Sequence, residues 1–172
     1  MSNNQSSLTY MVESFVRQLY SELNDVNLFV KDYKWMNDDR NELRNRNKAK
    51  VVSCFYKIYD YKNLSMPVTG VDFIQNSQCK VNFTFFYGEG YSKFDIFSWD
   101  KHFKERYNKI AGVRYKDNIL YRKKIINQPL VTKAFFGTGN NNFSVDIMFS
   151  LCYNVVNDAD LGYEVKITNT KV

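Results

Sequence analysis

A long alternation near the carboxy terminus constrains the fold more than any other feature. Every odd-numbered residue from Phe143 to Val155 is apolar, and most of the residues between them are polar. This period of two predicts a strand with one face in a core. At about 3.3 Å per residue, the segment is longer than an ordinary strand. Residues 79–87 alternate in the same way and end at the Gly88-Glu89-Gly90 step, so we expect a sheet to organise the core.

Other segments are predicted to add strands to this sheet, at residues 51–61, 119–126 and 163–167. Apolar groups lie on both faces of the first of these, which is typical of a sheet that is covered on each side. Residues 24–33 are ambiguous, although Val26, Leu28 and Val30 alternate like a strand. Residues 64–77 contain Pro67 and Gly70, so we interpret them as a connection. Pro129 is expected to interrupt the regular structure after the strand at 119–126.

Two segments have helical periodicity. Val12, Phe15, Val16, Leu19 and Leu23 recur at the spacing of one helical face, which predicts a helix over residues 8–23 capped by Ser6 or Ser7. A second helix is predicted over residues 92–108, with Gly112 at its end. Its solvated face would carry Lys101, Lys104, Glu105 and Arg106.

The length of 172 residues suits one domain, and no internal repeat or linker divides the chain. We expect a polar tail over residues 1–7 and a single α+β domain over 8–172. Because strands adjoin one another while the helices stand apart, the predicted architecture is a mostly antiparallel sheet. It would be packed by an N-terminal helix and a second mid-chain helix.

The formal net charge of +6 fits contact with nucleic acid, an acidic protein face or an anionic membrane, and it also fits a plain lysine-rich protein. No apolar run approaches the length that crosses a bilayer. The first residues lack the basic and apolar blocks of a signal peptide. We therefore expect no membrane partner and a cytoplasmic site of synthesis.

Few residues are available for catalysis or metal binding. Cys54, Cys79 and Cys152 are far apart and lie in strand-like apolar runs, where a free thiol packs as a small hydrophobe. Only one histidine, His102, could accompany them, so neither a metal site nor a disulfide framework is expected. His102 itself lies beside basic neighbours, which favours a surface or boundary position.

The remaining chemical patterns are interpreted as turns. Asp38-Asp39 and Asp158-x-Asp160 lie in asparagine-rich surroundings that suit a solvated turn. Gly137-x-Gly139 precedes a strand and lacks the following helix that would face a phosphate. We predict no catalytic, cofactor-binding or metal-binding residues and no cofactor. We therefore do not expect the protein to be an enzyme.

The order of elements resembles a known family. A strand ending in Tyr87-Gly88 is followed by a helix, a strand, a Gly/Asn turn and the long strand with Val145-Asp146-Ile147-Met148-Phe149. A polar turn and Leu161-Gly162-Tyr163-Glu164-Val165-Lys166-Ile167 close the chain. Over most of residues 8–168, this order is similar to that of the neck, tail-terminator or tail completion proteins of tailed bacteriophages. The segment at 35–50 and the connection after residue 61 are larger than in compact members.

The resemblance implies a structural virion protein that forms a ring, usually of six copies, at the head-proximal end of the tail. Its partners would be further copies, the tail tube protein and the neck connector protein. It would be located in the virion after assembly in the host cytoplasm. A passing contact with DNA is one interpretation of the net positive charge. Long edge strands such as 143–155 would pair across subunits. The expected contact loops contain Arg40, Arg44, Arg46, Lys48, Gly137, Gly139, Asn140, Asn141 and Asn142.

Two other classes of function remain open. One is a small basic protein that binds single-stranded nucleic acid through aromatic rings beside basic residues. Its candidate residues are Phe55, Tyr56, Lys57, Tyr59, Tyr61, Tyr121, Arg122, Lys123 and Lys124. The other is a ligand-pocket domain with a cone-shaped helix-plus-sheet fold, which would need convergent polar groups in an apolar cavity.

Overall fold

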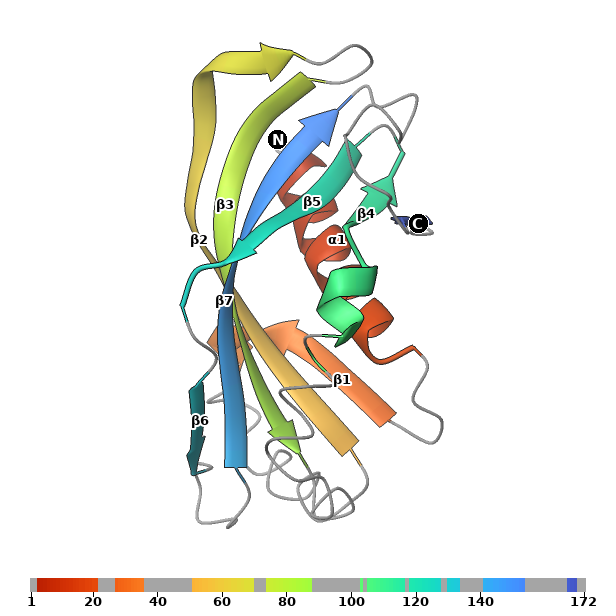
Figure 1. Cartoon of the computed structure of the whole chain (residues 1–172), viewed down its shortest axis with the longest axis vertical. Helices are drawn as coiled ribbons and strands as arrows, with labels where there is room; N and C mark the ends of the chain where they lie inside the picture. The colour runs from red at the N-terminus through yellow and green to blue at the C-terminus, as the bar shows by residue number, and fades with distance from the viewer. Residues whose placement is uncertain are drawn as a thin grey trace.

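The computed structural model describes residues 3–21, 27–35, 51–69, 74–87, 103, 105–116, 118–127, 130–133, 141–153 and 167–169. In these residues, helix α1 (Asn3–Leu19) packs against one curved sheet of eight strands (Figure 1). Five strand pairings are antiparallel and two are parallel. The predicted α+β class with a mostly antiparallel sheet and an N-terminal helix is therefore confirmed. No described helix is long and apolar enough to cross a bilayer.

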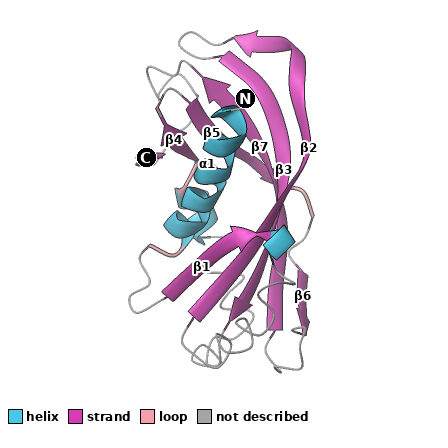
Figure 2. Ribbon diagram, turned by 180° about the vertical axis from the view of Figure 1, so that it is seen from behind, coloured by secondary structure: helices cyan, strands magenta, loops and turns pink. Residues whose placement is uncertain are grey.

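The strands lie in the order β1-β2-β3-β7-β5-β4-β8, and β6 pairs with β7 off this path. Their bounds are β1 Asn27–Asp32, β2 Val51–Thr69, β3 Ile74–Tyr87, β4 Gly112–Tyr115, β5 Asn118–Ile125, β6 Leu130–Lys133, β7 Asn141–Tyr153 and β8 Ile167–Asn169. A short 3-10 turn, η1 (Tyr33–Trp35), follows β1. Figure 2 shows α1 lying across the concave side of the sheet.

Helix α1 begins and ends earlier than the sequence indicates. It starts at Asn3, so most of the expected polar tail is helical, and Ser6 and Ser7 lie within the helix instead of capping it. It ends at Leu19, before Leu23. Apolar periodicity reports only the turns that pack against a core, so it carries no information about a polar first turn.

The connection expected over residues 64–77 is mostly strand. β2 continues to Thr69 and β3 starts at Ile74, so these two strands form a long hairpin. Pro67 lies in the irregular part of the ladder between Asn63 and Val68, where no pairing with β3 occurs. A proline at such a break removes no ladder hydrogen bond, which explains why it does not end the strand.

The longest predicted strand is confirmed as β7, but it lies inside the sheet. One of its edges pairs with β3, and the other pairs with β5 and then β6. The suggestion that residues 143–155 pair across subunits is therefore wrong. β5 and β6 both pair with the same edge of β7, at different places along it. Pro129 lies between them in the sequence, and the sequence did not predict β6.

The second helix is described only at Phe103 and residues 105–109. Gly112 does not end it, because this glycine is the first residue of β4, a strand that the sequence did not predict. A Cβ atom at Gly112 would lie 2.8 Å from the carbonyl oxygen of Leu120 on β5. Close backbone approach, and not a turn, therefore accounts for this glycine.

The core lies between α1 and the concave face of the sheet. Phe15 of α1 is fully buried, and its ring centroid lies 5.2 Å from that of Phe149 on β7 and 6.1 Å from that of Phe83 on β3. Cys79, Val81, Phe83 and Phe85 all face this core, as the alternation predicts. Each buried Phe contributes about 1.5–3 kcal/mol to the free energy of folding.

Candidate interaction site

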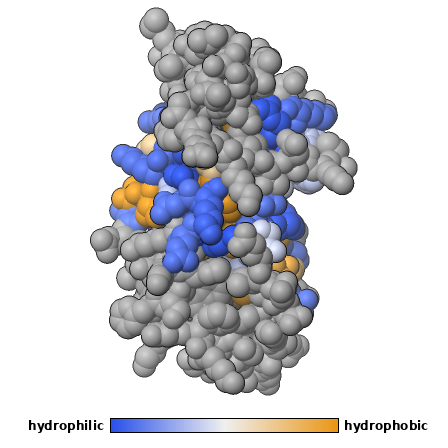
Figure 3. Space-filling model, turned by 45° about the vertical axis from the view of Figure 1, so that its right-hand side comes forward, coloured by the Kyte–Doolittle hydropathy of each residue, from blue (hydrophilic) through white to orange (hydrophobic). Residues whose placement is uncertain are grey.

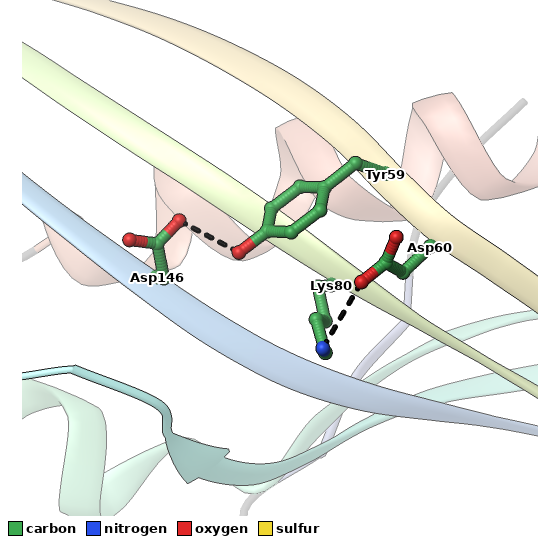
Figure 4. A network of polar contacts seen from close by, with 4 residues as sticks. All are labelled: Tyr59, Asp60, Lys80 and Asp146. Carbon is green, nitrogen blue, oxygen red and sulfur yellow. Dashed lines mark hydrogen bonds and ion pairs between the residues drawn. The ribbon is translucent and has the colours of Figure 1, made fainter.

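The outer face of the sheet, which points away from α1, carries a polar network at its centre (Figure 4). The Tyr59 hydroxyl of β2 donates to Asp146 Oδ1 of β7 at 3.0 Å, and Asn82 Nδ2 of β3 donates to the same oxygen at 3.1 Å. Asn82 also donates to Ser144 Oγ and accepts from Thr84 Oγ1. These bonds join three neighbouring strands, so the group ties the sheet together.

Tyr59 is held in its neutral form. Burial, followed by its hydrogen bond to Asp146 and the nearby carboxylate charges, raises the pKa of Tyr59 to about 12. A neutral phenol that donates to a carboxylate cannot act as a base near neutral pH. The polar groups of this face satisfy one another, so we read the network as structural.

A bulge in β2 lies beside this network. Tyr59 pairs with Lys80 and Lys62 pairs with Gln78, so β2 contains one more residue than β3 between these pairs. Asp60 lies at the bulge with φ of 49°, and its carboxylate accepts a hydrogen bond from Lys80 Nζ at 3.0 Å (Figure 4). The side chain of Asp60 is thus directed back over β3.

Beyond Tyr56, one edge of β2 has no described strand beside it. β1 pairs with β2 from Val51 to Tyr56, and η1 then lies against β2. Among the described residues, no strand pairs with β2 on this side from Lys57 onward. We call residues 57–63 on this side the open edge. Backbone N–H and C=O groups that face no described strand on this side are a template for another chain.

Exposed aromatic and basic side chains border the open edge. Tyr61, with 43% exposure, lies on it, and Tyr33 (40%) and Trp35 (45%) belong to η1. Lys57 and Lys62 are exposed on the edge itself, and Lys34 Nζ lies 5.6 Å from the centroid of the Trp35 ring. Tyr, Trp and Arg are the side chains that most often anchor protein interfaces, and two of these types gather here.

Among the described residues, buried side chains pack between α1 and the concave face of the sheet. Tyr56, 1% exposed, donates from its hydroxyl to Glu13 Oε2 of α1 at 2.6 Å. Burial and this bond raise the pKa of Tyr56 well above its usual value. In the described residues, α1 and buried aromatic rings fill the space that a ligand-pocket domain would keep free.

Most of the predicted base-stacking rings are not available. Phe55, Tyr56 and Tyr121 are 0%, 1% and 3% exposed. Arg122 Nε donates to the Ile110 carbonyl at 2.7 Å, so its charge is used inside the fold. Tyr61, Lys57, Lys123 and Lys124 remain exposed. Figure 3 shows another side of the molecule, where most described residues at the surface are hydrophilic.

The predicted contact residues are mostly outside the described part of the chain: Arg40, Arg44, Arg46, Lys48, Gly137, Gly139 and Asn140. Asn141 and Asn142 are the first residues of β7 and pair with Lys133 and Thr132 of β6, so they belong to a strand and not to the expected turn. His102, Asp38, Asp39, Asp158 and Asp160 also lie outside the described residues.

Sequence reasoning predicted a strand over residues 51–61 but did not place it at an edge of the sheet, because the pattern of one strand does not show which strands lie beside it. The three cysteines are buried free thiols, as predicted. Within the described stretches, no group of three or more His, Cys, Asp or Glu side chains is placed to hold a metal ion.

No protein-family model matches the chain, and no curated protein matches it in sequence.

Proposed function

We propose that this protein is a structural assembly subunit that works by binding neighbouring protein chains. The observation that carries the proposal is the open edge of β2, bordered by the exposed rings of Tyr33, Trp35 and Tyr61. Proteins protect such edges by shortening or covering them, or with lysines and bulges, because unpaired strands can pair with other chains. This edge carries Lys57, Lys62 and a bulge, so unrestricted pairing is limited, but the exposed rings beside it remain available for contact. Here, the strand that carries it is 19 residues long.

The assembly that we propose is the ring of tailed phages that terminates the tail tube and joins it to the neck. The order of helices and strands in this chain supports that assignment, since α1 opens the chain and the long hairpin β2–β3 precedes the second helix. A ring also requires two different side faces on each subunit that meet by rotation. The open edge is one such face, and it replaces β7 in the role of pairing strand.

The remaining polar features fit a structural role. The network of Tyr59, Asn82 and Asp146 joins strands, and Tyr56 joins β2 to α1 through Glu13. Each of these groups forms its hydrogen bonds with other residues of the fold. None of them is therefore assigned a part in a reaction.

The first test is the size of the particle in solution. Mass photometry and negative-stain microscopy of the purified protein should show closed rings, with six copies as the expected number. A protein that stays monomeric up to its solubility limit, alone and with the tail tube protein, contradicts the proposal. Proteomic detection of the chain in purified virions is an independent test that does not require the ring to form in isolation.

A further inference from the structure

We propose that the open edge of β2, residues 57–63, binds an acidic, extended polypeptide segment of a neighbouring protein by strand addition. This inference rests on the proposed assembly function and names the chemistry of the partner. It uses the backbone of β2 for affinity and the side chains beside it for the choice of partner.

Backbone geometry supplies the first argument. Pairing with β3 on one side holds β2 in extended form from Lys57 to Tyr59 and again at Lys62 and Asn63. The other side faces no described strand beyond Tyr56. The edge is therefore already ordered, and a segment that pairs with it loses only its own conformational freedom. An incoming strand would extend the sheet next to the end of β1.

Charge supplies the second argument. Lys34, Lys57 and Lys62 are exposed, and none of them forms an ion pair with a described residue. Among the nearby described carboxylates, Asp60 forms an ion pair with Lys80, which leaves Asp32 against three lysines. The edge is thus basic, and a segment rich in Glu or Asp complements it.

The same charges exclude a second copy of this edge as the occupant. Pairing two such edges would bring Lys57 and Lys62 of one copy close to those of the other, and like charges on adjacent strands are destabilising. The bulge at Asp60 also interrupts the ladder and prevents a long regular pairing. The edge therefore favours a short acidic strand over unrestricted self-association.

The exposed rings supply the third argument. Tyr33 and Trp35 are held beside β2 by η1, and Tyr61 lies on the edge. Apolar side chains that alternate with the acidic ones in a bound strand would cover these rings. The best probe is therefore a peptide in which Glu and Val alternate.

The experiment measures fluorescence anisotropy of a labelled, capped peptide Glu-Val-Glu-Val-Glu-Val-Glu titrated with the full chain. Two control peptides separate the contribution of charge from that of backbone hydrogen bonding. One replaces every Glu with Lys, and the other methylates the backbone nitrogens of all seven residues, which removes the N–H donors on both edges of the peptide without changing charge. We expect saturable binding of the parent and at least about a tenfold loss of affinity for either control.

Variants of the protein locate the site. Lys57→Glu with Lys62→Glu should weaken binding of the parent peptide by about tenfold or more, because two attractive pairs become repulsive. The matched control, Lys109→Glu with Lys116→Glu, reverses two exposed lysines elsewhere and should change affinity by less than about twofold. Circular dichroism of both variants verifies that the fold is retained. Hydrogen exchange should show slower exchange of residues 57–63 when the parent peptide is bound.

Three results would overturn the inference. The first is no binding of the parent peptide. The second is equal binding of the N-methylated peptide, which would mean charge attraction without strand addition. The third is stronger binding of oligo-dT than of the peptide, lost in the Lys57/Lys62 variant, which would make the edge a nucleic-acid site. Ring formation is measured separately by mass photometry. A negative result in the peptide test would therefore contradict this inference without contradicting the assembly proposal.

Discussion

Arg106 Nη2 donates a hydrogen bond to the carbonyl oxygen of Gln18 at 3.1 Å, in the last turn of α1. The same guanidinium donates from Nε to the Leu19 carbonyl at 3.3 Å and from Nη2 to Ser21 Oγ. Arg106 is only 6% exposed, although the sequence places it on the solvated face of its helix. A cation at this point satisfies orphan carbonyls and interacts favourably with the helix dipole.

Replacing this arginine should therefore destabilise the protein. We expect Arg106→Ala to lower the free energy of unfolding by about 2–3 kcal/mol, since hydrogen bonds from a charged donor to the Gln18 and Leu19 carbonyl groups are lost. Lys109→Ala, an exposed neighbour, should change it by less than about 0.5 kcal/mol. Urea denaturation followed by circular dichroism measures both. Equal effects of the two variants would refute the capping role.

The bond between Tyr56 and Glu13 should matter in a similar way. Tyr56→Phe removes a 2.6 Å hydrogen bond to a carboxylate, and we expect a loss of about 1.5–3 kcal/mol. Tyr33→Phe removes a hydroxyl from an exposed ring and serves as the control, with no measurable change expected. Thermal or urea unfolding at neutral pH is the measurement. A loss below about 0.5 kcal/mol in Tyr56→Phe would contradict the prediction.

The two raised tyrosine pKa values predict a loss of stability in alkali. The pKa of Tyr59 is about 12 and that of Tyr56 is raised further, whereas both titrate near 10 in the unfolded chain. Because the folded state favours the neutral phenols, their contribution is complete below about pH 10 and is lost as pH rises above it. Urea midpoints measured between about pH 9 and pH 12 should fall. Tyr56→Phe should show a smaller fall than the parent.

Gly112 should not tolerate a methyl group. A Cβ there would lie 2.8 Å from the Leu120 carbonyl oxygen and 3.1 Å from Cγ2 of Ile119, so β4 and β5 would have to separate. We expect Gly112→Ala to lower the free energy of unfolding by about 1–3 kcal/mol. Hydrogen exchange of β4 and β5 would show where the change acts. An unchanged urea midpoint would mean that the two strands shift at no cost.

The buried thiols should react only when the protein opens. Burial raises the pKa of Cys79 to about 12 and that of Cys152 to about 11, and it raises that of Cys54 as well. At pH 8, a thiol with a pKa of 11 has about a hundredfold less thiolate than one with a pKa of 9. Labelling with a disulfide reagent should therefore be slow in buffer and complete, at three thiols, in denaturant. Rapid labelling of native protein would disagree with the structure.

Local patterns in the sequence predicted much of this fold. The alternation of Phe143 to Tyr153 and of Cys79 to Phe85 identified β7 and most of β3. The spacing of Val12, Phe15, Val16 and Leu19 identified the buried face of α1. These elements could be read because hydrophobic burial imposes a period of two on a strand and 3.6 on a helix.

Elements with little burial signal could not be read in this way. β4 has four residues, β6 has four and β8 has three. Such short strands form because they pair with the edge of a neighbouring strand. The extension of β2 past Pro67 depends on pairing with β3, and the break in the ladder is visible only in three dimensions. The buried position of Arg106 depends on where α1 ends.

The sequence by itself determined which side chains share a face, because that follows from periodicity along one segment. Only the tertiary structure decided which strand stands at an edge. Strand order arises from contacts between segments far apart in the chain, and a central strand and an edge strand can have the same alternation. The strand with the clearest pattern, β7, is paired on both sides, while β2 has no described strand on one side beyond Tyr56.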